Sequence, residues 1–303
     1  MEGNALLFEL EIALPDARLT EQANRLVGFG RRYARMRQDL RLLIEQDGLE
    51  KWSNTHYGSR VALLDVLLDR YPLAVFHGDV GTGKTATAEA VANALSRELG
   101  KEGMLFKLST RVRGSGNVGE MSTLINQAFD VVTKEAGRNK LSFLVIDEAD
   151  SLASSRSESQ SHHEDKVAVN TLIQKVDDSR RFKGRVVVIL CTNRFPALDP
   201  AITRRAAYIE EFARPNDQER EELLRLDCAG LGLSEPNIKE LVRLTGQNGP
   251  HKAIYTFSDL RTRLFPEALA FAYPDRKLNR QDFEDAVKRI RPTPSIVPKE
   301  AAT

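Results

Sequence analysis

Short apolar runs alternate with helix-period segments through the middle of the chain. The apolar runs span residues 73–77, 104–108, 141–146 and 185–191. The segments between them that carry apolar residues at helical spacing span 86–97, 121–134 and 166–177. Apolar runs without polar alternation are typical of strands buried on both faces. The pattern therefore predicts an α/β fold with a parallel sheet, whose ligands bind at the carboxyl ends of the strands.

The N-terminal part has a different pattern. Residues 8–12 alternate between apolar and acidic side chains, and 20–46 carry apolar residues at helical spacing with many arginines between them. We expect a half-exposed strand and then one long amphipathic helix. A loop over 52–58 and a helix over 59–70, capped by Ser59, should lead into the first apolar run.

After residue 214 the pattern is helical, with segments at 218–228, 235–244, 258–273 and 280–290. These segments predict a second, smaller domain of helices. The final residues are rich in proline and weakly apolar, which predicts a mobile tail. The expected organisation is an N-terminal helical extension (1–55), a large α/β domain (56–214), a helical domain (215–291) and the tail (292–303).

One glycine-rich stretch follows the first apolar run directly. Gly78-Asp79-Val80-Gly81-Thr82-Gly83-Lys84-Thr85 fits G-x-x-x-x-G-K-[ST] at every fixed position, and a predicted helix begins at Ala86. Glycines let the backbone turn its N–H groups toward phosphate oxygens, and a helix N-terminus adds partial positive charge. We expect residues 78–86 to bind a nucleotide, with Lys84 on the β/γ-phosphates and Thr85 on Mg²⁺.

Polar side chains follow the third and fourth apolar runs, which are predicted strands of the sheet. Asp147 and Glu148 end one apolar run, and Asn193 follows the next. Asp147 would hold Mg²⁺ together with Thr85 and water, and Glu148 would orient or deprotonate the attacking water. Asn193 would hydrogen-bond the γ-phosphate or that water.

Two arginines, Arg204 and Arg205, follow a short helical turn after these strands. An arginine supplied across a subunit boundary stabilises the charge of phosphoryl transfer and increases the rate by about 10³–10⁵. Either residue fits this role in a ring, and both also fit a solvated surface pair.

Composition narrows the class of protein. The 303 residues carry 44 basic and 43 acidic side chains, so the net charge of +1 provides no global attraction to nucleic acid or anionic membranes. Cys191 and Cys228 are too few for a disulfide framework, and the start lacks a basic secretory region. We expect a cytoplasmic protein without a membrane segment.

Over about residues 55 to 290 the chain resembles the AAA+ ATPases, a group of P-loop NTPases, because the motifs above appear in that family's order. They correspond to Walker A (78–85), Walker B (143–148), sensor 1 (Asn193) and the arginine finger (Arg204 or Arg205). In the helical lid, Arg261 is the candidate for sensor 2 and Arg263 is the alternative. The resemblance implies a homohexamer with ATP and Mg²⁺ between subunits, which moves loops in a central pore.

Three further stretches of the sequence resemble the pachytene-checkpoint subfamily, whose bacterial members act with HORMA-domain proteins in cyclic-oligonucleotide antiphage defence. These stretches are 147–152, 169–174 and 205–207. The resemblance implies a remodeller that pulls on a polypeptide of a folded HORMA-domain partner. Only about 55 residues of this sequence precede the ATPase module, so we expect no large N-terminal adaptor-binding domain of the kind that the animal relatives carry.

The place of pore loop 1 is occupied by Asn117, Val118 and Gly119, without the aromatic residue that many relatives carry. Val118, flanked by Arg111 and Arg113, is a candidate to grip a polypeptide. Two adjacent histidines, His162 and His163, lie where pore loop 2 would be, and in a polar stretch they form a poor metal site.

Two other functions fit parts of the sequence. Arg111, Arg113 and the arginine-rich face of residues 25 to 41 would suit a nucleic-acid-associated AAA+ protein such as a helicase loader. Near-neutral charge argues against it, and we expect no nucleic-acid partner. A nucleotide-gated scaffold without turnover is disfavoured because Glu148 is present.

Overall fold

The computed structural model describes residues 7–109, 120–137, 139–152 and 163–296. Contacts divide the chain into two compact units. Unit 1 comprises Met1–Ala23, Phe29–His77 and Thr85–Glu211, and unit 2 comprises Asn24–Gly28, Gly78–Lys84 and Phe212–Thr303. The glycine-rich loop therefore groups with the C-terminal helices, although it lies between two segments of unit 1 in the sequence.

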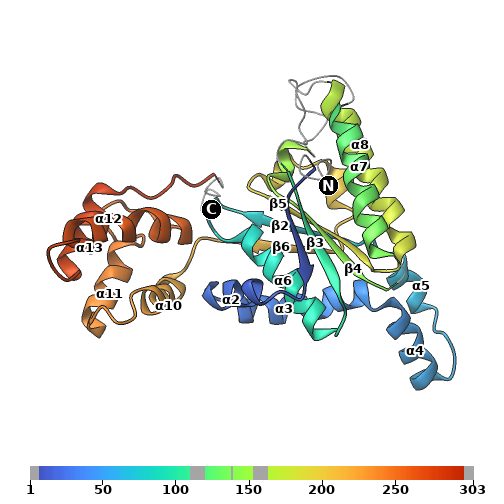
Figure 1. The fold of residues 1–303 in the computed structure, drawn as a ribbon, viewed down its shortest axis with the longest axis horizontal. Coiled ribbons are helices and arrows are strands. Elements are labelled where there is room, and N and C mark those ends of the chain that lie inside the picture. The colour runs from blue at the N-terminus through green and yellow to red at the C-terminus, as the bar shows by residue number, and fades with distance from the viewer. Residues whose placement is uncertain (1–6, 110–119, 138, 153–162, 297–303) are drawn as a thin grey trace, which may run out of the picture. The chain divides into compact units, whose positions relative to one another are not determined.

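A six-stranded sheet has the order β1-β3-β4-β5-β2-β6 (Figure 1). Its strands are β1 Phe8–Leu14, β2 Leu73–Gly78, β3 Gly103–Leu108, β4 Leu141–Ile146, β5 Val186–Thr192 and β6 Tyr208–Phe212. The pairs β3/β4, β4/β5 and β5/β2 are parallel, which confirms the predicted α/β fold. The four parallel strands are the four continuous apolar runs, and β4 and β5 are buried along their whole length.

The other two strands lie at the edges of the sheet. β1 pairs antiparallel with β3, so the segment 1–55 is not a separate helical extension, and that prediction is wrong in this respect. β6 was not expected from the sequence, because in this strand a charged side chain is buried and an apolar side chain is exposed. Glu210 is 6% exposed there, whereas Ile209 is 42% exposed. Tyr208 and Arg35 hydrogen-bond the buried Glu210 carboxylate, each at 2.5 Å, which explains how a strand accommodates it.

Helices α6 Lys84–Glu98, α7 Glu120–Ala136 and α8 His163–Ser179 alternate with the parallel strands along the chain. Figure 1 shows α7 and α8 side by side. Apolar residues of α7 and α8, among them Phe129 and Leu172, form one core with Leu144 of β4 and Val188 of β5. Short elements complete the unit: η2 Ala149–Ser151, η3 Arg180–Phe182, η4 Phe195–Ala197 and α9 Pro200–Thr203.

The N-terminal helices differ from the prediction. The single helix expected over 20–46 is α2 Ala17–Arg25 and α3 Phe29–Ile44, separated by Gly28 at φ 72°. The predicted loop over 52–58 is wrong, since α4 Gln46–Tyr57 covers it and ends at Gly58, a glycine in the left-handed conformation. The next helix, α5 Leu63–Leu68, begins after Ala62, so Ser59 does not cap it.

Unit 2 contains the predicted helical domain. Its helices are α10 Asp217–Asp227, α11 Glu235–Leu244, the π-helix η5 Asp259–Leu264, α12 Phe265–Ala272 and α13 Arg280–Arg289. Capping boxes at Asn216 and Asn279 begin α10 and α13. The helices share a core that includes Leu223, Tyr255 and Phe283.

The first part of the predicted mobile tail is held in place. Thr293 and Ser295 form side-chain hydrogen bonds with Asp259 and Asp79, respectively, each at 2.6 Å. The expectation of a free tail is therefore wrong for residues 293–296, because weakly apolar sequence does not exclude anchoring by polar contacts. No helix in the described ranges is long and apolar enough to cross a membrane.

Candidate nucleotide-binding and catalytic site

The glycine-rich loop links β2 to α6, which is the strand-loop-helix arrangement that the sequence predicts. Gly78, Gly81 and Gly83 have φ angles of 136°, 71° and 91°, a region that other residues rarely adopt. Space is also limited. A Cβ atom on Gly78 would lie 2.2 Å from the Phe212 carbonyl oxygen, and one on Gly81 would lie 2.7 Å from the Thr256 hydroxyl. Glycine is therefore required at the start of the loop.

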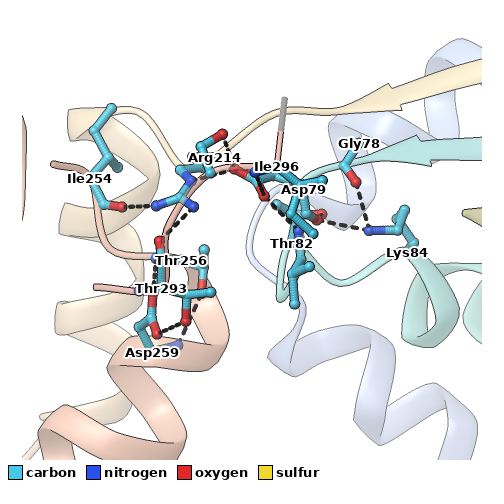
Figure 2. Close-up of polar contacts among 12 residues, drawn as sticks. Gly78, Asp79, Thr82, Lys84, Arg214, Ile254, Thr256, Asp259, Thr293 and Ile296 are labelled. Carbon is cyan, nitrogen blue, oxygen red and sulfur yellow. Dashed lines mark hydrogen bonds and ion pairs between the residues drawn. The ribbon is translucent and has the colours of Figure 1, made fainter. Parts of the chain in front are cut away.

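The loop is folded around the carbonyl oxygen of Asp79 (Figure 2). The Thr82 hydroxyl donates to this oxygen at 2.8 Å, and the Lys84 ammonium donates to it at 2.7 Å. Lys84 also donates to the Gly78 carbonyl at 3.1 Å and is 6% exposed. The ammonium predicted to bind phosphate is thus positioned by backbone oxygens of its own loop.

Thr85 and Asp147 lie together in unit 1. Thr85 is in the first turn of α6, and its hydroxyl donates to the Asp147 Oδ2 at 2.7 Å. Asp147 directly follows β4. A hydroxyl and a carboxylate are oxygen ligands of the kind that Mg²⁺ takes beside phosphates and water. The donor chemistry fits the predicted metal site.

Glu148 is the next residue and has the left-handed conformation, with φ 48°. Its backbone N–H donates to the Asp147 Oδ1 at 2.8 Å, and its side chain is exposed. This conformation is costly for glutamate, and such residues cluster at functional sites. The Glu148 N–H thus binds the Asp147 oxygen that Thr85 does not bind. The turn begins η2, where the Ser151 hydroxyl donates to the Glu148 carbonyl.

Asn193 follows β5 directly and is half-buried. Ile146 and Leu190 are partners in parallel strands, so Asp147, Glu148 and Asn193 come at the same edge of the sheet.

Sequence reasoning missed a second connection at this edge. The Thr192 hydroxyl donates to Asp150 at 2.7 Å and accepts from the Arg194 N–H at 3.0 Å. These bonds tie the turn after β4 to the turn after β5. The sequence signal that could have indicated this connection is Asp150, the second aspartate of the sequence Asp-Glu-Ala-Asp.

Arg204 and Arg205 follow α9 and have different surroundings. Arg205 forms a bidentate ion pair with Asp177 at 2.6 and 3.0 Å, donates to the Ala201 carbonyl and lies 5.1 Å from the Tyr71 ring centre. The hydrogen bond with Asp177 raises the pKa of Arg205. Arg204 is exposed, and its guanidinium has no hydrogen bond or ion pair to the residues that the structure describes.

The two candidates for sensor 2 are both paired within unit 2. Arg261 binds both Asp227 oxygens, at 2.6 and 3.0 Å, and the Arg25 carbonyl. Arg263 donates to Asp259 at 3.1 Å.

The beginning of the predicted sensor 2 region, residues 256–258, contacts the phosphate loop, and the sequence did not predict this contact. The Ser258 N–H donates to the Gly81 carbonyl at 3.1 Å, and Thr256 lies against the same glycine. No sequence pattern marked these two small hydroxyl residues.

Several arginines of the arginine-rich face of residues 25 to 41 are paired with carboxylates of the same chain. Arg35 binds Glu210, Arg37 binds Glu98 at 2.7 Å, and Arg41 binds Glu45 at 2.6 Å. This neutralisation weakens the case for a nucleic-acid surface there.

The pore-loop residues Arg111, Arg113, Asn117, Val118 and Gly119 lie outside the described residues. His162 does too, and His163 begins α8. Among the described residues, no group of three or more His, Cys, Asp or Glu side chains could hold a metal ion.

Comparison with known proteins places the chain in a family. Residues 74–214 match the model "ATPase family associated with various cellular activities (AAA)". CD-NTase-associated protein 6 of Escherichia coli strain KTE188 is 52% identical over 289 residues, which are 95% of this chain and 97% of the relative.

Two solved structures support the same assignment. The first is titled "Structure of E. coli MS115-1 HORMA:CdnC:Trip13 complex", with 40% identity, a TM-score of 0.88 and coverage of 97% of this chain and 98% of the other. The second is Trip13 of a Rhizobiales bacterium, with 33% identity, a TM-score of 0.72 and coverage of 95% and 100%. The chain therefore belongs to the AAA family of ATPases, as a member that resembles CD-NTase-associated protein 6 and Trip13.

Proposed function

We propose that this protein is an ATP-driven hexameric remodeller, which uses hydrolysis of Mg²⁺-ATP to disassemble or convert a complex of a HORMA-domain protein. The observation that carries the ATPase part is the contact between Thr85 and Asp147, because it joins the end of the phosphate loop to the acidic pair after β4. The partner is inferred from the similar structure, whose title names HORMA and CdnC.

Each residue of the site has a defined task. The backbone N–H groups of residues 78–86 and the Lys84 ammonium bind the phosphates. Mg²⁺, when bound near Thr85 and Asp147, would neutralise charge on the β- and γ-phosphate oxygens. Glu148 accepts a proton from the attacking water or orients it, and Asn193 hydrogen-bonds the γ-phosphate or that water.

Arg204 is the proposed arginine finger, acting on the nucleotide of a neighbouring subunit. Arg205 is already held by Asp177 and Tyr71, so it suits a structural role better. Arg261 remains the candidate for sensor 2, with Arg263 as the alternative. An arginine finger acts on the nucleotide of a neighbouring subunit, so this role requires the ring that we propose.

The partner would be gripped by the pore loop at Val118, with Arg111 and Arg113 beside it. We also propose a role in antiphage signalling, which is supported by the similarity to proteins named for their association with CD-NTases. The cytoplasmic location stays a proposal from the sequence. The nucleic-acid-associated alternative is disfavoured by the internal pairing of Arg35, Arg37 and Arg41.

The test is a pull-down with Glu148→Gln. Removing the general base should preserve ATP binding, abolish hydrolysis and trap the hexamer on its partner. Glu135→Gln is a matched control, because Glu135 forms an exposed pair with Lys140. ATP-dependent recovery of a HORMA-domain protein with Glu148→Gln supports the proposal. Salt-sensitive recovery of DNA or RNA alone would establish the nucleic-acid alternative instead.

A further inference from the structure

The segment after α13 contacts the phosphate loop and its surroundings, all within unit 2. We call residues 293–296 the C-terminal strap. The strap is anchored at Thr293, whose N–H and hydroxyl donate to the two Asp259 oxygens at 3.0 and 2.6 Å. Asp259 is 1% exposed, so this anchor is buried (Figure 2).

The other end of the strap binds Asp79, the second residue of the phosphate loop. The Ser295 hydroxyl donates to Asp79 Oδ2 at 2.6 Å, and the Ile296 N–H donates to Oδ1 at 3.3 Å. The side chain of Asp79 is 4% exposed. Burial would raise the pKa of this carboxyl, but the hydrogen bonds from Arg214 and Ser295 outweigh it, so the pKa lies below the usual value.

Arg214 joins the strap to the same carboxylate. Its Nε donates to Asp79 Oδ2 at 2.6 Å, and its two Nη atoms donate to the Ile254 and Thr293 carbonyls at 2.6 and 2.7 Å (Figure 2). All three nitrogens of the guanidinium are thus used. The guanidinium is planar and its N–H donors have fixed directions, so three bonds to different partners fix its orientation. We assign it this positioning role because a buried ion pair gains little net stability after desolvation.

Asp79 connects this network to the nucleotide-binding groups. Its side chain is held by Arg214 and the strap, and its carbonyl oxygen holds Thr82 and Lys84 at 2.8 and 2.7 Å. If the side chain were released and the backbone of Asp79 changed conformation, this carbonyl would move and displace the Lys84 ammonium. A loop that is already ordered loses less conformational freedom when a ligand binds.

We propose that Arg214 and the C-terminal strap are positioning elements for nucleotide binding: they hold Asp79, and Asp79 holds the phosphate loop in its binding conformation. This inference rests on nucleotide binding by the loop, as in the proposed function. It makes the affinity for ATP and ADP dependent on Arg214, which is 135 positions from Asp79 in the sequence, and on Ser295, which is 216 positions from it.

The test measures ADP binding and steady-state ATP hydrolysis by full-length variants. Ser295→Ala should raise the Kd for ADP and the KM for ATP about three- to tenfold, with kcat changed by less than about twofold. Ser295→Thr retains the hydroxyl and should restore both values. Arg214→Lys keeps the charge but loses the planar guanidinium that bonds three partners, so it should weaken ADP binding as well.

Truncation supplies the matched comparison. A chain that ends at Pro292 should lose about tenfold or more in ADP affinity, whereas one that ends at Ile296 should bind as the full chain does. Thermal unfolding identifies variants that are folded at the temperature of the measurement. Ser295→Ala that is folded and binds ADP with unchanged Kd would overturn the role of the strap.

Lys84→Ala separates this inference from the proposed function. Suppose that Lys84→Ala loses nucleotide binding while both truncated chains bind normally. This result would support nucleotide binding by the loop and would reject the role of the strap. A wild-type chain that binds no nucleotide would reject both.

Discussion

The hydroxyl oxygen of Thr85 lies 2.7 Å from Oδ2 of Asp147, so the first turn of α6 and the end of β4 are joined by a direct hydrogen bond. Asp147 Oδ1 accepts from the Glu148 N–H at 2.8 Å. The carboxylate that should approach a metal is therefore held at both oxygens by groups of this chain. This preorganisation makes the Thr85 hydroxyl directly testable.

We expect Thr85→Ala to lower ATP turnover at least about tenfold and to raise the Mg²⁺ concentration needed for half-maximal activity, because one oxygen ligand is lost. Thr85→Ser retains the hydroxyl and should keep most of the activity. The measurement is a magnesium titration of ATPase activity. Equal magnesium dependence in Thr85→Ala and the wild type would exclude Thr85 from the metal site.

Gly78→Ala should abolish nucleotide binding and lower the melting temperature. Its Cβ would lie 2.2 Å from the Phe212 carbonyl oxygen, in a backbone region unfavourable to alanine. Gly30→Ala is the control, because Gly30 lies in α3 with no neighbour within 4 Å of its Cβ position and should gain about 0.5–1 kcal/mol. Thermal unfolding with and without ADP compares the two. A Gly78→Ala chain that binds ADP normally would contradict the packing at this position.

Arg204→Ala and Arg205→Ala should fail in different ways. Arg204→Ala should keep the melting temperature and lose about 10³-fold or more in ATP turnover, since its guanidinium is exposed. Arg205→Ala should lower the melting temperature, because it removes the pair with Asp177 and the contact with Tyr71.

Mixing subunits tests action across the interface. Arg204→Ala subunits retain Glu148, and Glu148→Gln subunits retain Arg204, so mixed rings should recover ATPase activity. Full activity of Arg204→Ala alone would eliminate it as the finger.

Stability in acid should depend on Asp259. Burial would raise the pKa of this carboxyl, but hydrogen bonds from Thr293 and Thr256 lower it below the ordinary 3.8. A carboxyl with a depressed folded-state pKa stabilises the fold above its unfolded-state pKa, and this stabilisation is lost as the pH falls through the folded-state pKa.

Asp259→Asn should therefore cost about 1–3 kcal/mol at pH 7, and the difference from wild type should shrink as the pH falls below about 3.8. Melting temperatures between pH 7 and pH 3 measure this difference in stability. Asp275→Asn is the control, because Asp275 is exposed. A difference that is constant over this range would refute the assignment.

The central site was predictable because its parts are local. β2, the phosphate loop and α6 follow one another directly, and Asp147-Glu148 and Asn193 each directly follow a continuous apolar strand. The parallel sheet then brings these positions to one edge. Residues 110–119 lie outside the described part of the chain, so the pore-loop expectations stay predictions.

Features that depend on tertiary contacts were not predictable in the same way. The break at Gly28 interrupts a sequence whose apolar spacing continues, and β6 buries Glu210 because Arg35 and Tyr208 bind it. The strap depends on bonds between Ser295 and Asp79, which no local pattern encodes. The sequence likewise could not show that Arg205, unlike Arg204, is paired with Asp177, and our preference for Arg204 as the arginine finger rests on that pair.

We expect β1 to affect the solubility of the protein as well as its fold. It covers the outer edge of β3 through antiparallel pairing from Phe8 to Leu14, and its Glu9 forms an ion pair with Lys107 at 2.6 Å. An uncovered strand edge offers unpaired N–H and C=O groups to other chains, and charged side chains on an edge discourage such pairing. Deleting the first 14 residues should therefore cause insolubility and sheet-mediated aggregation during expression, even though every nucleotide-binding residue would remain.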